Sequence, residues 1–195
     1  MKELIRSGMV LFLGFALSNC VSPPNDLRST NALRDVIIPI DVKHDALTKR
    51  TSYTGPNCAE HPADHIVLIR AWITPDAEGT YQVYISDTYT DAQSRNGKGW
   101  LLYDRVQDLE GTAFSAEVLS RQVNWCAKNT CQYVEAVGVT ISRQYLQDRA
   151  DRGITLRISG SGGEAIAKIS STYLQAFLKR VPESQSIREP TRVKF

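Results

Sequence analysis

The segment HIVLIRAWIT at residues 65–74, the turn PDAEG at 75–79 and the segment TYQVYISDT at 80–88 decide the fold class. The first segment is rich in β-branched and aromatic residues, which favour strands. The last segment alternates, with tyrosine, valine and isoleucine on one face, which is the period of a strand with one buried face. Proline, aspartate and glycine between the two segments are typical of a hairpin turn. Together they predict an antiparallel β-hairpin.

Similar short segments lie on both sides of this hairpin. We expect further strands at Val36–Val42, Trp100–Val106, Cys131–Ile141, Ile154–Ser159 and Glu164–Ile169, and strand structure within Phe114–Cys126. The first of these contains Pro39, so we place it at a sheet edge. The polar segment Lys43–Asp64 is expected to be irregular, and the glycine-rich segment Gly160–Gly163 is expected to be a hairpin turn.

Two helices are expected near the C-terminus. Ser142 is a suitable N-cap for a short helix over Arg143–Arg149, and Ser170 or Ser171 for a last helix that ends at Pro182. Many short strands with one terminal helix predict a mainly β protein, with one antiparallel β-sandwich-like domain and a short C-terminal helix. A small α+β domain is the alternative.

The N-terminal residues follow the plan of a secretory signal peptide. Lys2 and Arg6 supply positive charge, and the apolar run Gly8–Leu17 is too short to span a bilayer. We therefore expect a signal peptide at 1–19, a tether at 20–35, the β-rich domain at 36–182 and a mobile polar tail at 183–195.

The residues Leu17-Ser18-Asn19-Cys20 resemble the lipobox of bacterial lipoprotein precursors. That resemblance implies cleavage before Cys20 and acylation of this cysteine, with several acyl chains such as palmitate holding the protein to the membrane. Because Val21 follows, it also implies the outer membrane, with the domain facing the periplasm. Asn19 departs from the small residue that is usual there. Cleavage before Asn19 by an ordinary signal peptidase is the alternative and would give a soluble periplasmic or secreted protein.

The remainder of the chain resembles uncharacterised bacterial envelope lipoproteins. The strings that carry this resemblance are VLIRAW at 67–72 and STYLQA at 171–176. The resemblance implies location in the bacterial cell envelope and brings no activity with it.

The charge balance argues against several classes of partner. The chain has 23 lysines and arginines, 21 acidic residues and a formal net charge of +2. It has no basic stripe of the kind that binds nucleic acid, and no acidic block that would bind many cations. We expect no nucleic-acid partner and no cofactor. The expected partners are the membrane, through the N-terminal lipid, and another envelope protein.

The four cysteines suggest one disulfide in an exported domain. Cys126 and Cys131 enclose a polar turn and are expected to staple a hairpin. Lipidation of Cys20 would leave Cys58 without a partner cysteine, whereas a non-lipidated chain would allow a Cys20–Cys58 bridge.

The segment from Cys58 to His65 collects donor types that bind metals. Cys58, His61, Asp64 and His65 are the weak candidates for a zinc site, but Pro62 separates the histidines and no second Cys/His pair follows. We expect no metal and no catalytic residues, because the sequence has neither a Gly-x-Ser-x-Gly elbow nor a phosphate-loop pattern. The preferred interpretation is a polar loop before a strand.

Glu135 breaks the apolar face of the segment Cys131–Ile141. A buried carboxylate would have a raised pKa or a cationic partner. We favour a local bulge that turns Glu135 outward. Trp72 and Trp125 are expected in the core.

The loop Asp91–Gly99 is the best candidate for a binding loop, because its aromatic neighbours would add contact area. The residues proposed for binding are Tyr89, Asp91, Arg95, Asn96, Lys98 and Trp100. An ordinary hairpin loop is the alternative.

These observations favour a cell-envelope lipoprotein that acts as a binding, assembly or structural module through its loops or an exposed strand edge. One alternative is an envelope hydrolase or peptidoglycan-modifying enzyme built around Cys58, His61 and His65. Another is an inhibitor or immunity-type lipoprotein, which would differ only in its partner.

Overall fold

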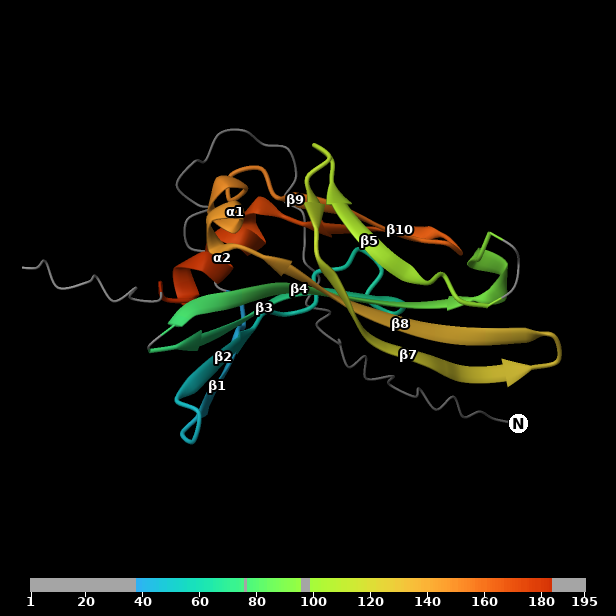
Figure 1. Cartoon of the computed structure of the whole chain (residues 1–195), viewed down its shortest axis with the longest axis horizontal. Helices are drawn as coiled ribbons and strands as arrows, with labels where there is room; N and C mark the ends of the chain where they lie inside the picture. The colour runs from blue at the N-terminus through green and yellow to red at the C-terminus, as the bar shows by residue number, and fades with distance from the viewer. Residues whose placement is uncertain (1–37, 76, 96–98, 184–195) are drawn as a thin grey trace, which may run out of the picture.

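The computed structural model describes residues 38–75, 77–95 and 99–183 of the chain. These residues form two antiparallel sheets that face each other across one core, with two short helices at one end (Figure 1). The prediction of a mainly β, sandwich-like domain with a short C-terminal helix is therefore confirmed. Within the described part of the chain, no helix has the length and hydrophobicity needed to cross a bilayer.

The large sheet has six strands in the order β1-β2-β3-β4-β8-β7. Its strands are β1 (Asp41–Asp45), β2 (Arg50–Thr54), β3 (His65–Thr74), β4 (Ala77–Thr90), β7 (Ala116–Ala127) and β8 (Thr130–Ile141). The predicted hairpin is β3–β4, and it supplies the middle of this sheet. Alternation along β4 buries Tyr81, Val83 and Ile85 on the inner face, as the sequence pattern predicts.

The small sheet has four strands in the order β10-β9-β5-β6. They are β5 (Tyr103–Asp108), β6 (Ala113–Phe114), β9 (Ile154–Gly160) and β10 (Glu164–Ile169). The predicted turn at Gly160–Gly163 joins β9 to β10, with the Gly160 amide donating to the Gly163 carbonyl at 2.8 Å. The chain leaves β6 and enters β7 after one residue, so it passes there from the small sheet to the large one.

Both predicted helices form, each with its predicted type of N-cap. Helix α1 (Arg143–Asp148) begins after Ser142, and helix α2 (Ser171–Arg180) begins after Ser170. In both, the cap serine accepts a hydrogen bond from the third amide of the helix, which satisfies one open donor of the first turn. Helix α2 buries Tyr173, Leu174 and Phe177.

The β5–β6 turn holds helix α1 through a buried carboxylate, Asp108. Its oxygens accept hydrogen bonds from the amides of Glu110 and Thr112 at 2.9 and 2.8 Å, from the Tyr145 hydroxyl at 2.7 Å and from Arg149 Nη2 at 2.9 Å. Burial and the bond to Asp108 raise the pKa of Tyr145 to about 12. We call these five residues the Asp108 site.

Two predictions for the N-terminal part of the domain are wrong. Of the strand expected at Val36–Val42, residues 36 and 37 lie outside the described part of the chain; among the described residues the strand begins at Asp41, and Ile38 and Ile40 before it pack on the core. The segment 43–64 is not wholly irregular, because β1 and β2 pair as a hairpin in its first part. Apart from Val42 and Tyr53 the side chains of these two strands are polar, so the alternation that marks a half-buried strand is missing.

Candidate functional site

Four ionisable side chains lie in one row across the inner face of the large sheet. The registers place His65 of β3 opposite Asp87 of β4, Asp87 opposite Glu135 of β8, and Glu135 opposite Arg121 of β7. Directly opposed residues share a face and lie within contact distance. Alternation along each strand therefore brings these four residues together, although they are far apart in the sequence.

Glu135 is 1% exposed and takes its hydrogen bonds from both sheets. Oε1 accepts from the Tyr89 hydroxyl at 2.6 Å and from the Leu102 amide at 2.9 Å, and Oε2 accepts from the Tyr103 amide at 3.1 Å. Consecutive amides that converge on one group form an anion-binding arrangement. Leu102 has a φ of 59°, a left-handed conformation that costs a non-glycine residue about 1 kcal/mol.

Asp87 is 3% exposed and binds the ends of two side chains. Oδ2 accepts from the Tyr103 hydroxyl at 2.6 Å, and Oδ1 contacts Nδ1 of His65. Burial, together with the adjacent Asp87 carboxylate, raises the pKa of Tyr103. Tyr103 thus joins the two carboxylates, with its hydroxyl on Asp87 and its amide on Glu135. We call Asp87, Tyr89, Tyr103 and Glu135 the inter-sheet site.

The two ends of the row reach solvent on opposite sides of the inter-sheet site. The His65 side chain is 37% exposed and the Arg121 side chain is 33% exposed. Arg121 places Nε 3.4 Å from Oε2 of Glu135 and Nη2 3.3 Å from the Tyr103 carbonyl. The buried carboxylates are thus flanked by a histidine at one end and an arginine at the other.

The prediction that a bulge turns Glu135 outward is wrong. Strand β8 pairs with β4 without interruption from Gln132 to Ile141, so Glu135 stays on the inner face. The irregularities lie in the neighbouring strand β7, after Val118 and after Val123. The carboxylate is stable inside because Leu102, just before β5, and Tyr103, the first residue of β5, supply donors, which the local pattern cannot reveal.

The predicted metal candidates do not form a metal site. The Cys58 thiol is buried and donates to the Val67 carbonyl at 3.2 Å, whereas His61 and Asp64 are exposed in a turn. Within residues 38–75, 77–95 and 99–183, no group of three or more His, Cys, Asp or Glu side chains is placed to bind an ion. Of these candidates, only His65 belongs to the row of ionisable residues.

The predicted binding loop is anchored to the start of β8. The Asp91 carboxylate accepts from the amide of Cys131 at 2.6 Å and from that of Gly99 at 2.9 Å, and these bonds lower the pKa of Asp91. Trp100 packs edge-on against Tyr133, with ring centroids 4.7 Å apart. Arg95 is exposed, and Asn96 and Lys98 lie outside the described residues.

Tyr89 contributes no binding surface, contrary to the prediction. It is 3% exposed, and its hydroxyl bonds to Glu135 and accepts from the Leu101 amide at 2.9 Å. Its role is within the inter-sheet site, where burial and the bond to Glu135 raise its pKa.

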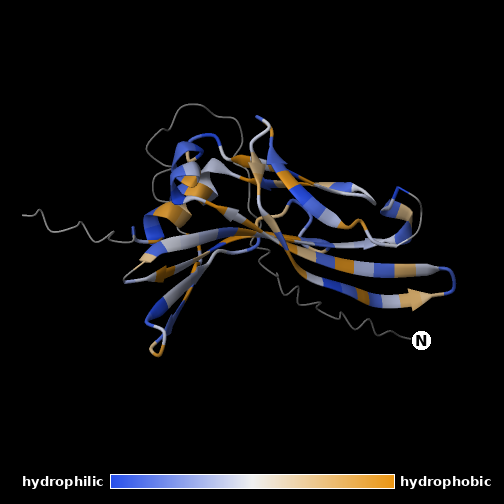
Figure 2. Ribbon diagram, viewed as in Figure 1, coloured by the Kyte–Doolittle hydropathy of each residue, from blue (hydrophilic) through white to orange (hydrophobic). Residues whose placement is uncertain are grey.

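The β7–β8 hairpin extends beyond the ends of β9 and β10 as an arm (Figure 1). The predicted disulfide is confirmed: Cys126 and Cys131 are directly opposed and bridged at the tip. The arm has mixed hydropathy along its length (Figure 2). Val118, Val123 and Trp125 are 43%, 51% and 45% exposed. Within the described chain β7 is the last strand of its sheet, so its second backbone edge has no strand beside it.

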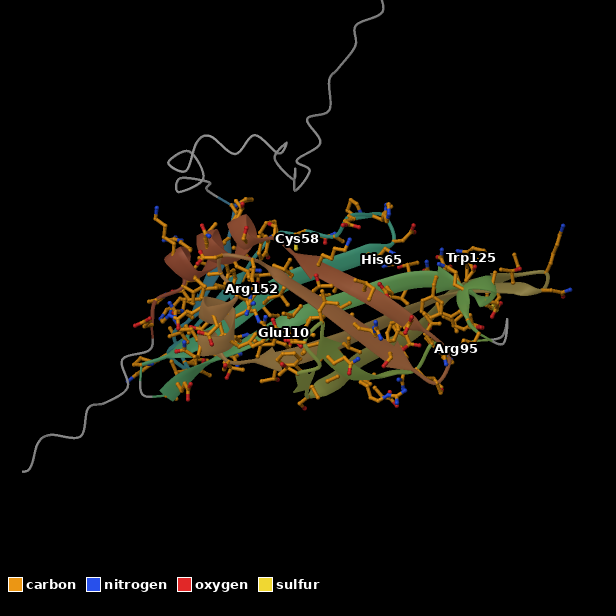
Figure 3. All side chains as sticks on the ribbon, turned by 90° about the horizontal axis from the view of Figure 1, so that it is seen from above. Cys58, His65, Arg95, Glu110, Trp125 and Arg152 are labelled. Carbon is orange, nitrogen blue, oxygen red and sulfur yellow. A yellow bond between two sulfur atoms is a disulfide. The ribbon has the colours of Figure 1, made fainter. Side chains whose placement is uncertain are left out.

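The expected burial of both tryptophans is wrong. Trp125 lies on the arm, away from Glu110 and Arg152 at the helical end (Figure 3). Trp72 is partly exposed on the outer face of β3, where the Arg70 guanidinium lies 5.0 Å from its ring centroid.

Sequence reasoning missed Asp87, Tyr103 and Arg121. A signal for Asp87 existed, because the alternation of β4 continues through Asp87 to Tyr89 on the buried face. No comparable signal marks Tyr103, whose role depends on the packing of one sheet on the other.

Comparisons with known proteins return no match. No protein-family model, no curated protein and no solved structure matches the chain.

Proposed function

We propose that this chain is a cell-envelope lipoprotein that acts as a binding or assembly module through the β7–β8 arm. The arm runs past the ends of β9 and β10 (Figure 1) while β8 stays paired with β4, and it carries exposed apolar side chains and ends in a disulfide. The single observation that carries the proposal is the open edge of the twelve-residue strand β7, beside which Val118, Val123 and Trp125 are exposed. An unpaired strand edge flanked by exposed apolar side chains is a site at which a protein can pair with another chain.

The inter-sheet site supports this proposal by fixing the base of the arm. Glu135 of β8 accepts amides of Leu102 and Tyr103 from the opposite sheet, and Arg121 of β7 reaches Glu135 and the Tyr103 carbonyl. The hairpin is therefore tied to the small sheet near Glu135, paired with β4 along β8, and closed at its tip by a covalent bridge. A rigid arm loses little conformational entropy when it binds.

We further propose lipidation at Cys20 and location at the outer membrane, facing the periplasm. Support comes from the lipobox-like sequence and from the disulfide, a bond typical of exported proteins. Intact mass of the membrane-extracted protein tests this, because acylation of Cys20 and the thiol state of Cys58 both change the mass. An unmodified chain that begins at Asn19 would support simple export instead.

Site-specific photo-cross-linking in living cells tests the binding role. A photoreactive amino acid at position 123 or 125 should give the same defined adduct. Position 109 is the matched control, because Leu109 is an apolar side chain, 73% exposed, in the β5–β6 turn. Adducts at position 109 but not at 123 or 125 would contradict the arm as the binding element. An inhibitor or immunity-type role would give the same adducts at positions 123 and 125, but the cross-linked partner would be one enzyme.

The pairing of His65 with Asp87 favours a hydrolase as the second candidate. A buried carboxylate on Nδ1 orients an imidazole whose other nitrogen can accept a proton. His65→Gln should then abolish hydrolysis of isolated peptidoglycan, with His44→Gln as control because His44 is exposed on β1. Unchanged hydrolysis in His65→Gln, or none in the parent chain, would rule this candidate out.

A further inference from the structure

The side chains of β7 on its inner face have a defined chemical order. Their partners on β8 identify them: Val118 opposes Val137, Arg121 opposes Glu135 and Val123 opposes Tyr133. Along the open edge, the inner face thus presents an apolar residue, a cation and an apolar residue. Glu117 opposes Gly138 and lies on the other face.

Arg121 is only partly satisfied by the protein itself. Its Nε contacts Glu135 at 3.4 Å, its Nη2 contacts the Tyr103 carbonyl at 3.3 Å, and the side chain remains 33% exposed. A residue directly opposite Arg121 on an added strand would have its Cβ about 5 Å away. A carboxylate at that position can bond the guanidinium in a charge-assisted pair.

We propose that β7 binds an extended segment of a partner protein as a seventh strand, with an acidic residue against Arg121 between apolar residues against Val118 and Val123. This inference rests on the proposed binding function and names the chemistry of the partner. Backbone hydrogen bonds supply affinity in such strand addition, and alternate side chains supply specificity.

A second copy of this chain does not fit the same edge. Antiparallel pairing of two β7 strands would have to provide an acidic residue for Arg121 from the inner face of β7. That face carries Ala116, Val118, Arg121, Val123 and Cys126, none of them acidic. Self-pairing would therefore leave both arginines without a carboxylate from the partner strand.

The two irregularities of β7 make the edge selective. They follow Val118 and Val123, so the regular stretch between them is short and contains Arg121. Bulges discourage indiscriminate pairing along an edge. The partner segment must match the short stretch around Arg121 and also follow the irregularity that separates this stretch from Val118.

The test uses the purified full chain and the capped peptide Thr-Val-Thr-Glu-Thr-Val-Thr at millimolar concentration. Binding should slow hydrogen exchange of β7 amides and change the tryptophan fluorescence, and the change should be lost in Trp125→Phe. A peptide with lysine in place of glutamate should bind about tenfold more weakly, and a peptide N-methylated at alternate residues should not protect β7. These peptide changes leave the protein fold untouched.

Arg121→Met tests the same contact from the protein side. It should erase the preference for glutamate over lysine in the peptide, whereas Arg105→Met, with a side chain 72% exposed on β5, should retain it. Unfolding curves report whether Arg121→Met is folded.

Equal affinity of the two charged peptides would overturn the acidic requirement. Absence of binding, or binding of the N-methylated peptide, would overturn strand addition, and so would β7 protection in a dimer without peptide. In each case, cross-links at positions 123 and 125 would still support the binding function, so the two failures are distinguishable.

Discussion

Glu135 and Asp108 are both buried carboxylates, 1% and 6% exposed, but they are stabilised differently. Asp108 accepts hydrogen bonds from two amides of its own turn, from the Tyr145 hydroxyl and, at 2.9 Å, from Nη2 of Arg149. Glu135 accepts hydrogen bonds from two amides at the start of β5, in the other sheet. The nearest arginine atom, Nε of Arg121, lies 3.4 Å from its Oε2. One carboxylate thus organises a local turn, and the other connects two sheets that meet only in the folded protein.

This comparison shows what a buried acid on an apolar strand can mean. In both sites the carboxylate is satisfied mainly by neutral donors, so burial does not by itself point to catalysis. Asp87 differs from both, because one of its oxygens contacts a histidine that reaches solvent. Of the three carboxylates, Asp87 is the one that supports the hydrolase candidate.

The largest expected effect is that of Glu135→Ala. It leaves the Tyr89 hydroxyl and the amides of Leu102 and Tyr103 without their acceptor. We expect a loss of about 3–5 kcal/mol in the free energy of unfolding, measured by urea denaturation. Glu117→Ala, on an exposed position of β7, is the control and should change stability by less than about 0.5 kcal/mol.

Asp108→Ala should cost less, about 1.5–3 kcal/mol by the same measurement. Its former donors lie near the surface and can turn to water, whereas the donors of Glu135 cannot. A loss of stability larger than that of Glu135→Ala would contradict the distinction between the Asp108 site and the inter-sheet site.

Tyr103→Phe removes the hydrogen bond from the Tyr103 hydroxyl to Asp87 but keeps the hydrogen bond from the amide of residue 103 to Glu135. We expect a loss of about 1–2 kcal/mol, because one buried carboxylate oxygen loses its donor. Tyr53→Phe, on the partly buried strand β2, provides a matched control that leaves the inter-sheet site intact. Equal losses in the two variants would show that the Tyr103–Asp87 bond contributes nothing.

The smallest effect concerns acid stability. Burial by itself would raise the pKa of Asp108. The hydrogen bonds from Tyr145, Thr112 and Glu110 outweigh burial and lower this pKa below its ordinary value. Asp108 therefore stabilises the folded state above about pH 4, and this contribution is lost as the pH falls through the lower folded pKa. The decline in stability between about pH 4 and pH 2 should be smaller in Asp108→Asn. If Asp108→Asn and the parent chain lost the same stability over this pH range, the lowered pKa of Asp108 would be contradicted.

The sequence predicts most of the fold because its strands alternate and its caps are local. The hairpin at residues 65–88 and both serine caps depend on neighbours within a few residues. The β1–β2 hairpin escapes prediction because it is mostly polar: Tyr53 of β2 packs against the core, but no alternating apolar face marks the two strands.

The candidate site is less predictable, because its partners come from distant strands. Asp87 and Glu135 each look like an interruption of an apolar pattern, and only register shows that they are opposed. The amides of Leu102 and Tyr103 carry no side-chain signal at all. The disulfide was predictable because a hairpin brings Cys126 and Cys131 together locally.

The passage of the chain from β6 to β7 has a consequence for the order of folding. Strands β7 and β8 are joined by a short turn, whereas β5 must find β9 across a loop that contains that whole hairpin. Contacts that close long loops form slowly, because the entropy is lost before the contacts are gained. We expect the arm to form early and the pairing of β5 with β9 to limit the rate. The amides that bind Glu135 precede and begin β5, so its carboxylate loses water only in that late step.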